Sequence, residues 1–377
     1  MAAQYFDPGA GGSERQACQQ AEDLAAAGCR VTVLARRALG VREQGLSDIR
    51  EIRFGSPGSP GPAEGGSLAA SFAFGLAIAA HVLCRAGDYD VFYFQGAGLT
   101  ACLSVPAARL RGLRMVCLVS GARSGTEAGS LRMRGGLGAW LARKVFLGVD
   151  AWIALSGEIE QGLIEDQIPA GRIRRIPYGV DRSRFRPLAP AERLAVRTRL
   201  GCPAEARVAI YSGRLIPSKG VVPFVGAWRR TGRPPGSLLL ILGDGPEMPA
   251  VKSAAGGDPS VLVLGASNCV EEVLAASDLF VFPSRREGMP NAVLEALSCG
   301  LPVAAFRIGG VAEMLEDGRE GVLLPEGDDE GLARTAAALL ADPEALGRMG
   351  RAAQLRAQAF DRPVIAQGLL ACLKDSA

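Results

Sequence analysis

Short apolar runs alternate with amphipathic stretches along most of this 377-residue chain. Each run is followed by a glycine-containing turn and then by a segment with helical periodicity. We predict strands at 31–35, 91–94, 115–119 and 151–154 in the first half, and at 208–212, 238–242, 261–264, 279–283 and 303–306 in the second. Apolar strands that alternate with helices are typical of parallel sheets covered on both faces. The pattern therefore predicts an α/β protein with two doubly wound, Rossmann-like domains facing across a cleft.

The segment 177–194 has neither the helical nor the strand periodicity, and it is rich in proline, glycine and arginine. Such a composition is typical of a linker. A chain of this length is too long to fold around a single ordinary hydrophobic core. We therefore predict an N-terminal domain at 1–186 and a C-terminal domain at 187–361. The amphipathic segment 362–377 is expected to be a helix that either completes the second domain or packs back on the first.

Composition excludes several classes of protein. Hydrophobic residues make up 48% of the chain and charged residues 21%, as in soluble globular proteins. A net charge of +3 gives no signal for nucleic acid. The chain has nine cysteines without a C-x-x-C pair, which indicates reduced, buried thiols in a cytoplasmic protein rather than disulfides; Cys117, Cys269 and Cys299 are among them. The single histidine, His81, also argues against a metal site. The apolar run at 68–84 is short for a membrane span, and we expect a buried helix there.

The strongest local signal is the segment 282–306, FPSRREGMPNAVLEALSCGLPVAAF. It predicts a strand, a loop, a helix with Pro290 in its first turn, and a stop at Gly300. The free N–H groups at such a helix start bind anions. Glu287 before the helix and Glu295 within it are suited to accept hydrogen bonds from sugar hydroxyl pairs. Alternatively, both acids only complement the helix dipole.

A second signal is the segment 211–222, in which Arg214 and Lys219 follow a predicted strand. Two cations at the carboxyl end of a strand can neutralise a diphosphate and the charge that grows on it as it leaves. The alternative is a solvated basic loop.

A third signal is the glycine turn at Gly11 and Gly12, which lets the backbone approach a ligand closely. Ser13 and Gln16 match a capping box, so we expect a helix to start there. The alternative is a tight turn without a ligand.

Two further motifs are weaker. Asp88-Tyr89-Asp90 has the form of a metal-binding D-x-D motif, but it opens a strand after a helix, and we interpret it as a plain turn without metal. The segment 132–144 mixes arginine and lysine with leucine, methionine and tryptophan, which would suit contact with anionic lipid. An ordinary exposed basic surface is the alternative.

Together these motifs resemble family 4 of the GT-B glycosyltransferases, the retaining, nucleotide-sugar-dependent class of the "glycosyl transferases group 1" type. The resemblance is dense in the C-terminal half, from Tyr211 to Glu313, and thinner before residue 175. The motifs that carry it are Gly243-Asp244-Gly245-Pro246-Glu247, Glu287-Gly288-Met289-Pro290-Asn291, Glu295-Ala296, Gly11-Gly12-Ser13-Glu14 and Pro177-Tyr178-Gly179-Val180-Asp181.

The resemblance implies a role for each matching residue. Arg214 and Lys219 would hold the donor diphosphate and act in catalysis with Glu287, which would contact the donor sugar. Glu295 would contact the ribose. The other implied donor-binding residues are Gly12, Gly243, Gly288, Met289, Pro290, Asn291 and Leu294.

The resemblance also implies the reaction. The N-terminal domain would bind a glycan or lipid-linked acceptor, and a hydroxyl of that acceptor would attack by front-face displacement without a metal or other cofactor. The donor, a UDP- or GDP-sugar, would be a substrate, and the product a surface polysaccharide or glycolipid. Peripheral contact with the cell membrane through 132–144 would fit such an acceptor.

The sequence departs from the family pattern in the short first strand, which has only residues 2–6 before the glycine turn, and at two single positions, of which the first leaves the positioning of the acceptor open. Gln95 follows the strand at 91–94, where many relatives carry a histidine, and Tyr178 stands where asparagine is common. Two alternatives therefore remain: a non-catalytic nucleotide-sugar-binding protein or partner subunit, and a nucleotide-sugar epimerase on the same fold.

Overall fold

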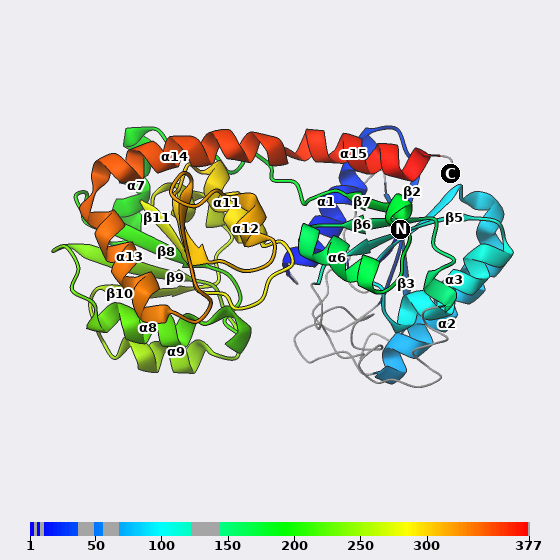
Figure 1. The fold of residues 1–377 in the computed structure, drawn as a ribbon, viewed down its shortest axis with the longest axis horizontal. Coiled ribbons are helices and arrows are strands. Elements are labelled where there is room, and N and C mark those ends of the chain that lie inside the picture. The colour runs from blue at the N-terminus through cyan, green and yellow to red at the C-terminus, as the bar shows by residue number, and fades with distance from the viewer. Residues whose placement is uncertain (4–5, 8–10, 37–48, 56–67, 122–143, 376–377) are drawn as a thin grey trace. The chain divides into compact units, whose positions relative to one another are not determined.

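The computed structural model describes all residues except 4–5, 8–10, 37–48, 56–67, 122–143 and 376–377 (Figure 1). The chain forms two compact units, one of Met1–Tyr178 with Pro363–Ala377 and the other of Gly179–Arg362. Each unit has its own parallel sheet with helices, which confirms the predicted pair of doubly wound α/β domains. The division between the units follows Tyr178, whereas the linker pattern placed it after Arg186, and the predicted domain limits stay a prediction.

The first unit contains a seven-stranded parallel sheet in the order β3-β2-β1-β4-β5-β6-β7. Its strands are β1 (Ala2–Ala3), β2 (Val31–Arg36), β3 (Ile49–Phe54), β4 (Val91–Gln95), β5 (Arg114–Val119), β6 (Ala151–Ala154) and β7 (Ile173–Arg175). The chain order reverses between β1 and β4, where Ala2 pairs with Phe94. This reversal is the switch point at which doubly wound sheets bind ligands, beyond the carboxyl ends of the strands.

The helices of the first unit are α1 (Gly12–Ala26), α2 (Leu68–Arg85), η2 (Ala86–Asp88), α3 (Leu99–Leu110), α6 (Gly157–Glu165), η4 (Ala170–Arg172) and α15 (Arg362–Lys374). The helix predicted at 68–84 is present as α2, which packs against α3 where Gly75 faces Leu103. This stretch of chain is long and apolar enough to cross a membrane, and 33% of it is buried. Its burial is therefore confined to part of its surface, and Phe72 and Leu76 are exposed.

The second unit contains a six-stranded parallel sheet in the order β10-β9-β8-β11-β12-β13. Its strands are β8 (Arg207–Ser212), β9 (Ser237–Leu242), β10 (Val261–Gly265), β11 (Leu279–Phe282), β12 (Val303–Phe306) and β13 (Gly321–Leu324). Nearly every residue of β8, β11 and β12 is buried, because helices cover both faces of the sheet. The switch point of this sheet lies between β8 and β11.

The helices of the second unit are α7 (Pro190–Arg199), η5 (Pro217–Lys219), α8 (Val221–Arg230), α9 (Met248–Ala255), α10 (Val270–Ala275), α11 (Asn291–Ser298), α12 (Val311–Met314), α13 (Asp329–Ala341), α14 (Pro343–Ala357) and η6 (Gln358–Phe360). Helix α8 packs between α9 and α13 on one face of the sheet, and α11 packs against α10 and α14 on the other (Figure 1).

Three local predictions need correction. The capping box does not form, because α1 begins at Gly12 with Gly11 as its N-cap residue and without a side-chain cap. Helix α11 begins at Asn291, so Pro290 is its N-cap residue rather than part of its first turn. Cys117 and Cys299 are buried as predicted, but Cys269 is exposed because it lies in the loop before α10.

Candidate functional site

Most of the predicted donor-binding residues lie in loops at the carboxyl edge of the second sheet. Arg214 and Lys219 lie between β8 and α8, and Glu287 lies between β11 and α11. Strands β8 and β11 are neighbours across the switch point, so their loops meet although they are far apart in the sequence. The structure therefore brings the cations and the acid together at the edge where parallel sheets bind ligands.

Glu287 is held by two donors. The Lys219 ammonium forms an ion pair with Glu287 Oε1, and the Ser284 hydroxyl donates to the same oxygen at 2.6 Å. The side chains of Lys219 and Glu287 are only 19% and 11% exposed. Lys219 Nζ also lies 5.9 Å from the centroid of the Phe282 ring, within cation–π range. Because Oε1 is occupied, the second oxygen of Glu287 is the one that can accept a hydrogen bond from a ligand.

Arg214 is positioned through its backbone. The buried Tyr211 hydroxyl donates to the Arg214 carbonyl at 2.9 Å, and the Tyr211 ring stacks on Phe282. Burial, reinforced by the negative charge of Glu287, holds the pKa of Tyr211 above its usual range, so the phenol stays protonated and can donate. The Arg214 side chain is exposed and makes no hydrogen bond or ion pair with any described residue. Its guanidinium is therefore available to an anion.

Backbone contacts fix the loops around this site. A Cβ added at Gly243, whose φ is 146°, would lie 1.8 Å from the Gly213 carbonyl oxygen, so only glycine fits there. Leu215 N–H donates to the Asp244 carbonyl at 2.8 Å, which ties the loop after β8 to the loop after β9. Gly243 therefore acts by positioning the neighbouring backbone rather than by offering a side chain.

The start of α11 supplies the remaining predicted contacts. Gly288, Met289 and Pro290 form the loop that enters the helix at Asn291. Glu295, one turn further along, is 7% exposed, and the Leu294 and Met289 side chains are buried. Leu294 and Met289 can therefore meet a ligand only through their backbone, whereas Glu295 offers a mostly buried carboxylate.

Two predicted elements lie elsewhere. Gly12 is the first residue of α1 in the other compact unit, and its role at the phosphate stays a prediction. In the predicted basic segment 132–144, all residues but Lys144 lie outside the described part of the chain.

Ser284 is a residue that the sequence reasoning missed. It orients Glu287 from three positions earlier, where the strand ends. Two signals were available: its place at the carboxyl end of a predicted strand, and the Phe282-Pro283-Ser284 stretch, which is part of the family resemblance.

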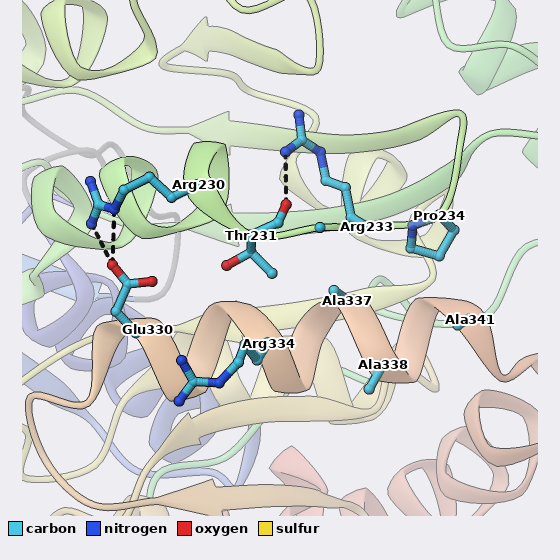
Figure 2. Close-up of a pocket in the computed structure, with 10 residues that line it drawn as sticks. Arg230, Thr231, Arg233, Pro234, Glu330, Arg334, Ala337, Ala338 and Ala341 are labelled. Atoms are coloured by element: carbon cyan, nitrogen blue, oxygen red, sulfur yellow. Dashed lines mark hydrogen bonds and ion pairs between the residues drawn. The ribbon is translucent and has the colours of Figure 1, made fainter.

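A separate surface hollow of about 770 Å³ lies between the end of α8 and α13 (Figure 2). Its wall includes Arg230, which is paired with Glu330 at 2.5 Å, and three alanines of α13. None of the predicted donor-binding residues lines it. We therefore place the functional site at the switch point and not in this hollow.

The chain matches two protein families, one in each half. Residues 11–179 match the family described as "Glycosyl transferase 4-like domain", and residues 206–342 match "Glycosyl transferases group 1". The first match lies almost wholly in the first compact unit and the second lies inside the second unit.

Curated relatives share part of the chain. The D-inositol 3-phosphate glycosyltransferase of Segniliparus rotundus is 31% identical over 238 residues, which are 58% of this chain and 52% of that protein. The N-acetyl-alpha-D-glucosaminyl L-malate synthase of Bacillus anthracis is 38% identical over 119 residues, which are 31% of each protein. The chain thus matches about half of the first relative and a third of the second.

A solved structure shares the whole fold. The crystal structure of Anabaena HepE in complex with UDP and glucose superposes with a TM-score of 0.78 at 22% identity, covering 100% of this chain and 99% of that one. At this identity the likeness concerns the fold alone. Both family models match, one in each half of the chain, and the chain has the same fold as the HepE structure. The chain therefore belongs to family 4 of the GT-B glycosyltransferases.

Proposed function

We propose that the protein is a retaining glycosyltransferase that moves a hexosyl group from a UDP- or GDP-sugar to a hydroxyl acceptor. The observation that carries this proposal is the group of Arg214, Lys219 and Glu287 at the switch point of the second sheet. Two cations beside an oriented carboxylate suit a diphosphate joined to a sugar. The UDP bound in the HepE structure supports this choice of donor, and the name of the Segniliparus relative supports glycosyl transfer.

Three sets of contacts would hold the donor. The diphosphate would lie against the Arg214 guanidinium and the Lys219 ammonium, with the start of α11 beside it. The second oxygen of Glu287 would accept a hydrogen bond from a sugar hydroxyl, and Glu295 would accept one from the ribose. Gly12, at the start of α1, would approach the phosphate through its backbone.

The reaction would retain the anomeric configuration. The acceptor hydroxyl would attack the anomeric carbon on the face from which the diphosphate departs. The bond between that carbon and the phosphate oxygen breaks with its electron pair moving to the phosphate, while the new carbon–oxygen bond forms. The hydroxyl proton passes to the departing phosphate oxygen. Arg214 and Lys219 would stabilise the growing negative charge, an effect worth about 10²–10³ in rate for one such donor.

The two cations can balance the charge of the diphosphate, so we propose that neither a metal nor another cofactor is required. We further propose a glycan or lipid-linked acceptor, a role in surface polysaccharide or glycolipid synthesis, and a cytoplasmic location. Peripheral contact with an anionic membrane through 132–144 belongs to the same proposal.

A donor screen tests the proposal. Thermal shift of the purified protein with a panel of UDP- and GDP-sugars identifies the donor, and mass analysis with candidate acceptors identifies the product. A glycosylated acceptor together with free nucleoside diphosphate supports transfer. Binding with neither hydrolysis nor transfer would favour a non-catalytic binding protein, and an isomerised nucleotide sugar without any acceptor would favour an epimerase.

A further inference from the structure

A small polar network lies inside the first unit, between α1 and the end of β4. The Tyr93 hydroxyl and the Gln95 amide nitrogen each donate to Gln20 Oε1 at 2.8 Å. Tyr93 is 3% exposed and Gln20 is 7% exposed, whereas Gln95 is only half-buried. Buried polar groups are costly unless they are hydrogen-bonded, so a network at this depth has a defined geometry.

The network fixes which way the Gln95 amide points. An amide oxygen can only accept, so the Tyr93 O–H must donate to Gln20 Oε1. Burial raises the pKa of Tyr93 well above its usual value, so that proton remains in place. The Gln95 amide nitrogen donates to the same Gln20 oxygen, so its –NH₂ group faces inward. Its carbonyl oxygen, Oε1, faces the opposite way.

The reversed arrangement is less favourable. If both amides were flipped, Gln20 would present –NH₂ to Tyr93, whose own O–H would lose its only acceptor among the described residues. A buried donor without an acceptor costs about 1–3 kcal/mol. The Tyr93 hydroxyl therefore decides the orientation of two amides.

Gln95 stands where a ligand is expected in this unit. It is the last residue of β4, and β4 pairs with β1 across the switch point of the first sheet. Ligands bind beyond the carboxyl ends of strands at such a point. The half-buried Gln95 carbonyl is thus at the binding edge, while its –NH₂ group is committed to the interior.

We propose that Gln95 presents Oε1 as a neutral hydrogen-bond acceptor to one hydroxyl of the sugar acceptor, and that Tyr93 is a positioning residue that fixes this orientation through Gln20. The inference rests on the proposed function, in which the first unit binds the acceptor. An amide can orient a hydroxyl but cannot take its proton, so Gln95 contributes specificity and not base catalysis. The acceptor class is therefore one with a hydroxyl at this point, and a deoxy analogue binds less well.

The Tyr93→Phe variant, which removes only the hydroxyl, tests the positioning role. Both amides can then rotate, and Gln95 offers –NH₂ in part of the molecules. We expect the KM for the acceptor to rise about fivefold, as for the loss of one ordinary hydrogen bond, with the donor KM and the slow hydrolysis of the donor unchanged. The matched control is Tyr89→Phe, whose hydroxyl bonds to His81 at 2.8 Å just before β4 begins, and which should leave every kinetic constant unchanged.

Deoxy analogues of the acceptor test the same contact without relying on one variant. The wild-type enzyme should discriminate against one deoxy analogue about tenfold. Gln95→Met, which keeps the side-chain length, should abolish that discrimination by raising the KM for the parent acceptor to that for the analogue. A folded Tyr93→Phe variant with an unchanged acceptor KM, or unchanged discrimination in Gln95→Met, would overturn the proposal. A wild-type protein that transfers no sugar at all would overturn the proposed function and this inference with it.

Discussion

Replacing Gly310 with alanine tests whether backbone contacts hold the donor loop in place. Gly310 has φ −63° and ψ −19°, a conformation that any residue adopts, so alanine introduces no backbone strain of its own. Its Cβ, however, would lie 2.1 Å from the carbonyl oxygen of Gly288, whereas ordinary contact begins at 3.4 Å. The loop that carries Gly288 and the adjacent Glu287 must therefore move by about 1.3 Å, since the interior is close-packed.

A shift of this size affects both the reaction and the stability of the fold. Misplacing a reacting group by about 1 Å costs on the order of 10²-fold in rate, which corresponds to about 2.7 kcal/mol of transition-state stabilisation. Overpacking typically destabilises a protein by about 1–3 kcal/mol. We expect Gly310→Ala to remain folded and to lose about 100-fold in kcat/KM for the donor.

Steady-state transfer kinetics and thermal unfolding of Gly310→Ala measure both effects. The matched control is Gly347→Ala in α14 of the same unit, where the added Cβ would lie 3.6 Å from a flexible arginine end. That variant should gain about 0.5–1 kcal/mol from helix propensity and keep its activity. A Gly310→Ala protein with kcat/KM within about twofold of wild type, and with unchanged Tm, would refute the reasoning, because an overlap of this size has to move the loop.

Three further predictions concern the same site. Ser284→Ala removes the 2.6 Å hydrogen bond to Glu287 and should lower kcat about 5–10-fold in transfer assays, and an unchanged kcat would show that Lys219 alone orients the carboxylate. Glu295→Ala should raise the donor KM at least about tenfold in a folded protein, whereas full activity would remove Glu295 from the ribose contact. Dialysis against EDTA should leave the transfer rate unchanged, and loss of activity restored by a divalent cation would contradict charge balance by Arg214 and Lys219.

The apolar strands of both sheets could be predicted because buried parallel strands are nearly continuous hydrophobic runs. Strand β3 escaped prediction because its sequence, IREIRF, carries charges at half of its positions, as edge strands often do. Strand β7 escaped because it has only three residues. In both cases the segment is a strand because it pairs with a neighbouring strand. A local sequence pattern does not show such pairing.

The candidate site likewise contains residues that could be predicted from the sequence and contacts that could not. Arg214, Lys219 and Glu287 were predicted together because each follows a recognisable strand, and their meeting follows from the strand order across the switch point. The support from Ser284 and the contact between Gly310 and Gly288 depend on how loop backbones meet in space, so the sequence could not show them. The capping box was wrong because α1 begins one residue before Ser13, with Gly11 as its N-cap residue.

Calorimetric titration of UDP and GDP tests the account most directly, because it measures the diphosphate contact without needing an acceptor. The proteins to compare are the wild type, Lys219→Ala, and Lys252→Ala at an exposed lysine of α9 in the same unit. We expect one nucleoside diphosphate to bind the wild type and Lys252→Ala equally, and Lys219→Ala about tenfold or more weakly. Equal binding by Lys219→Ala, or no binding of either nucleotide to the wild type, would contradict a donor site at Arg214, Lys219 and Glu287.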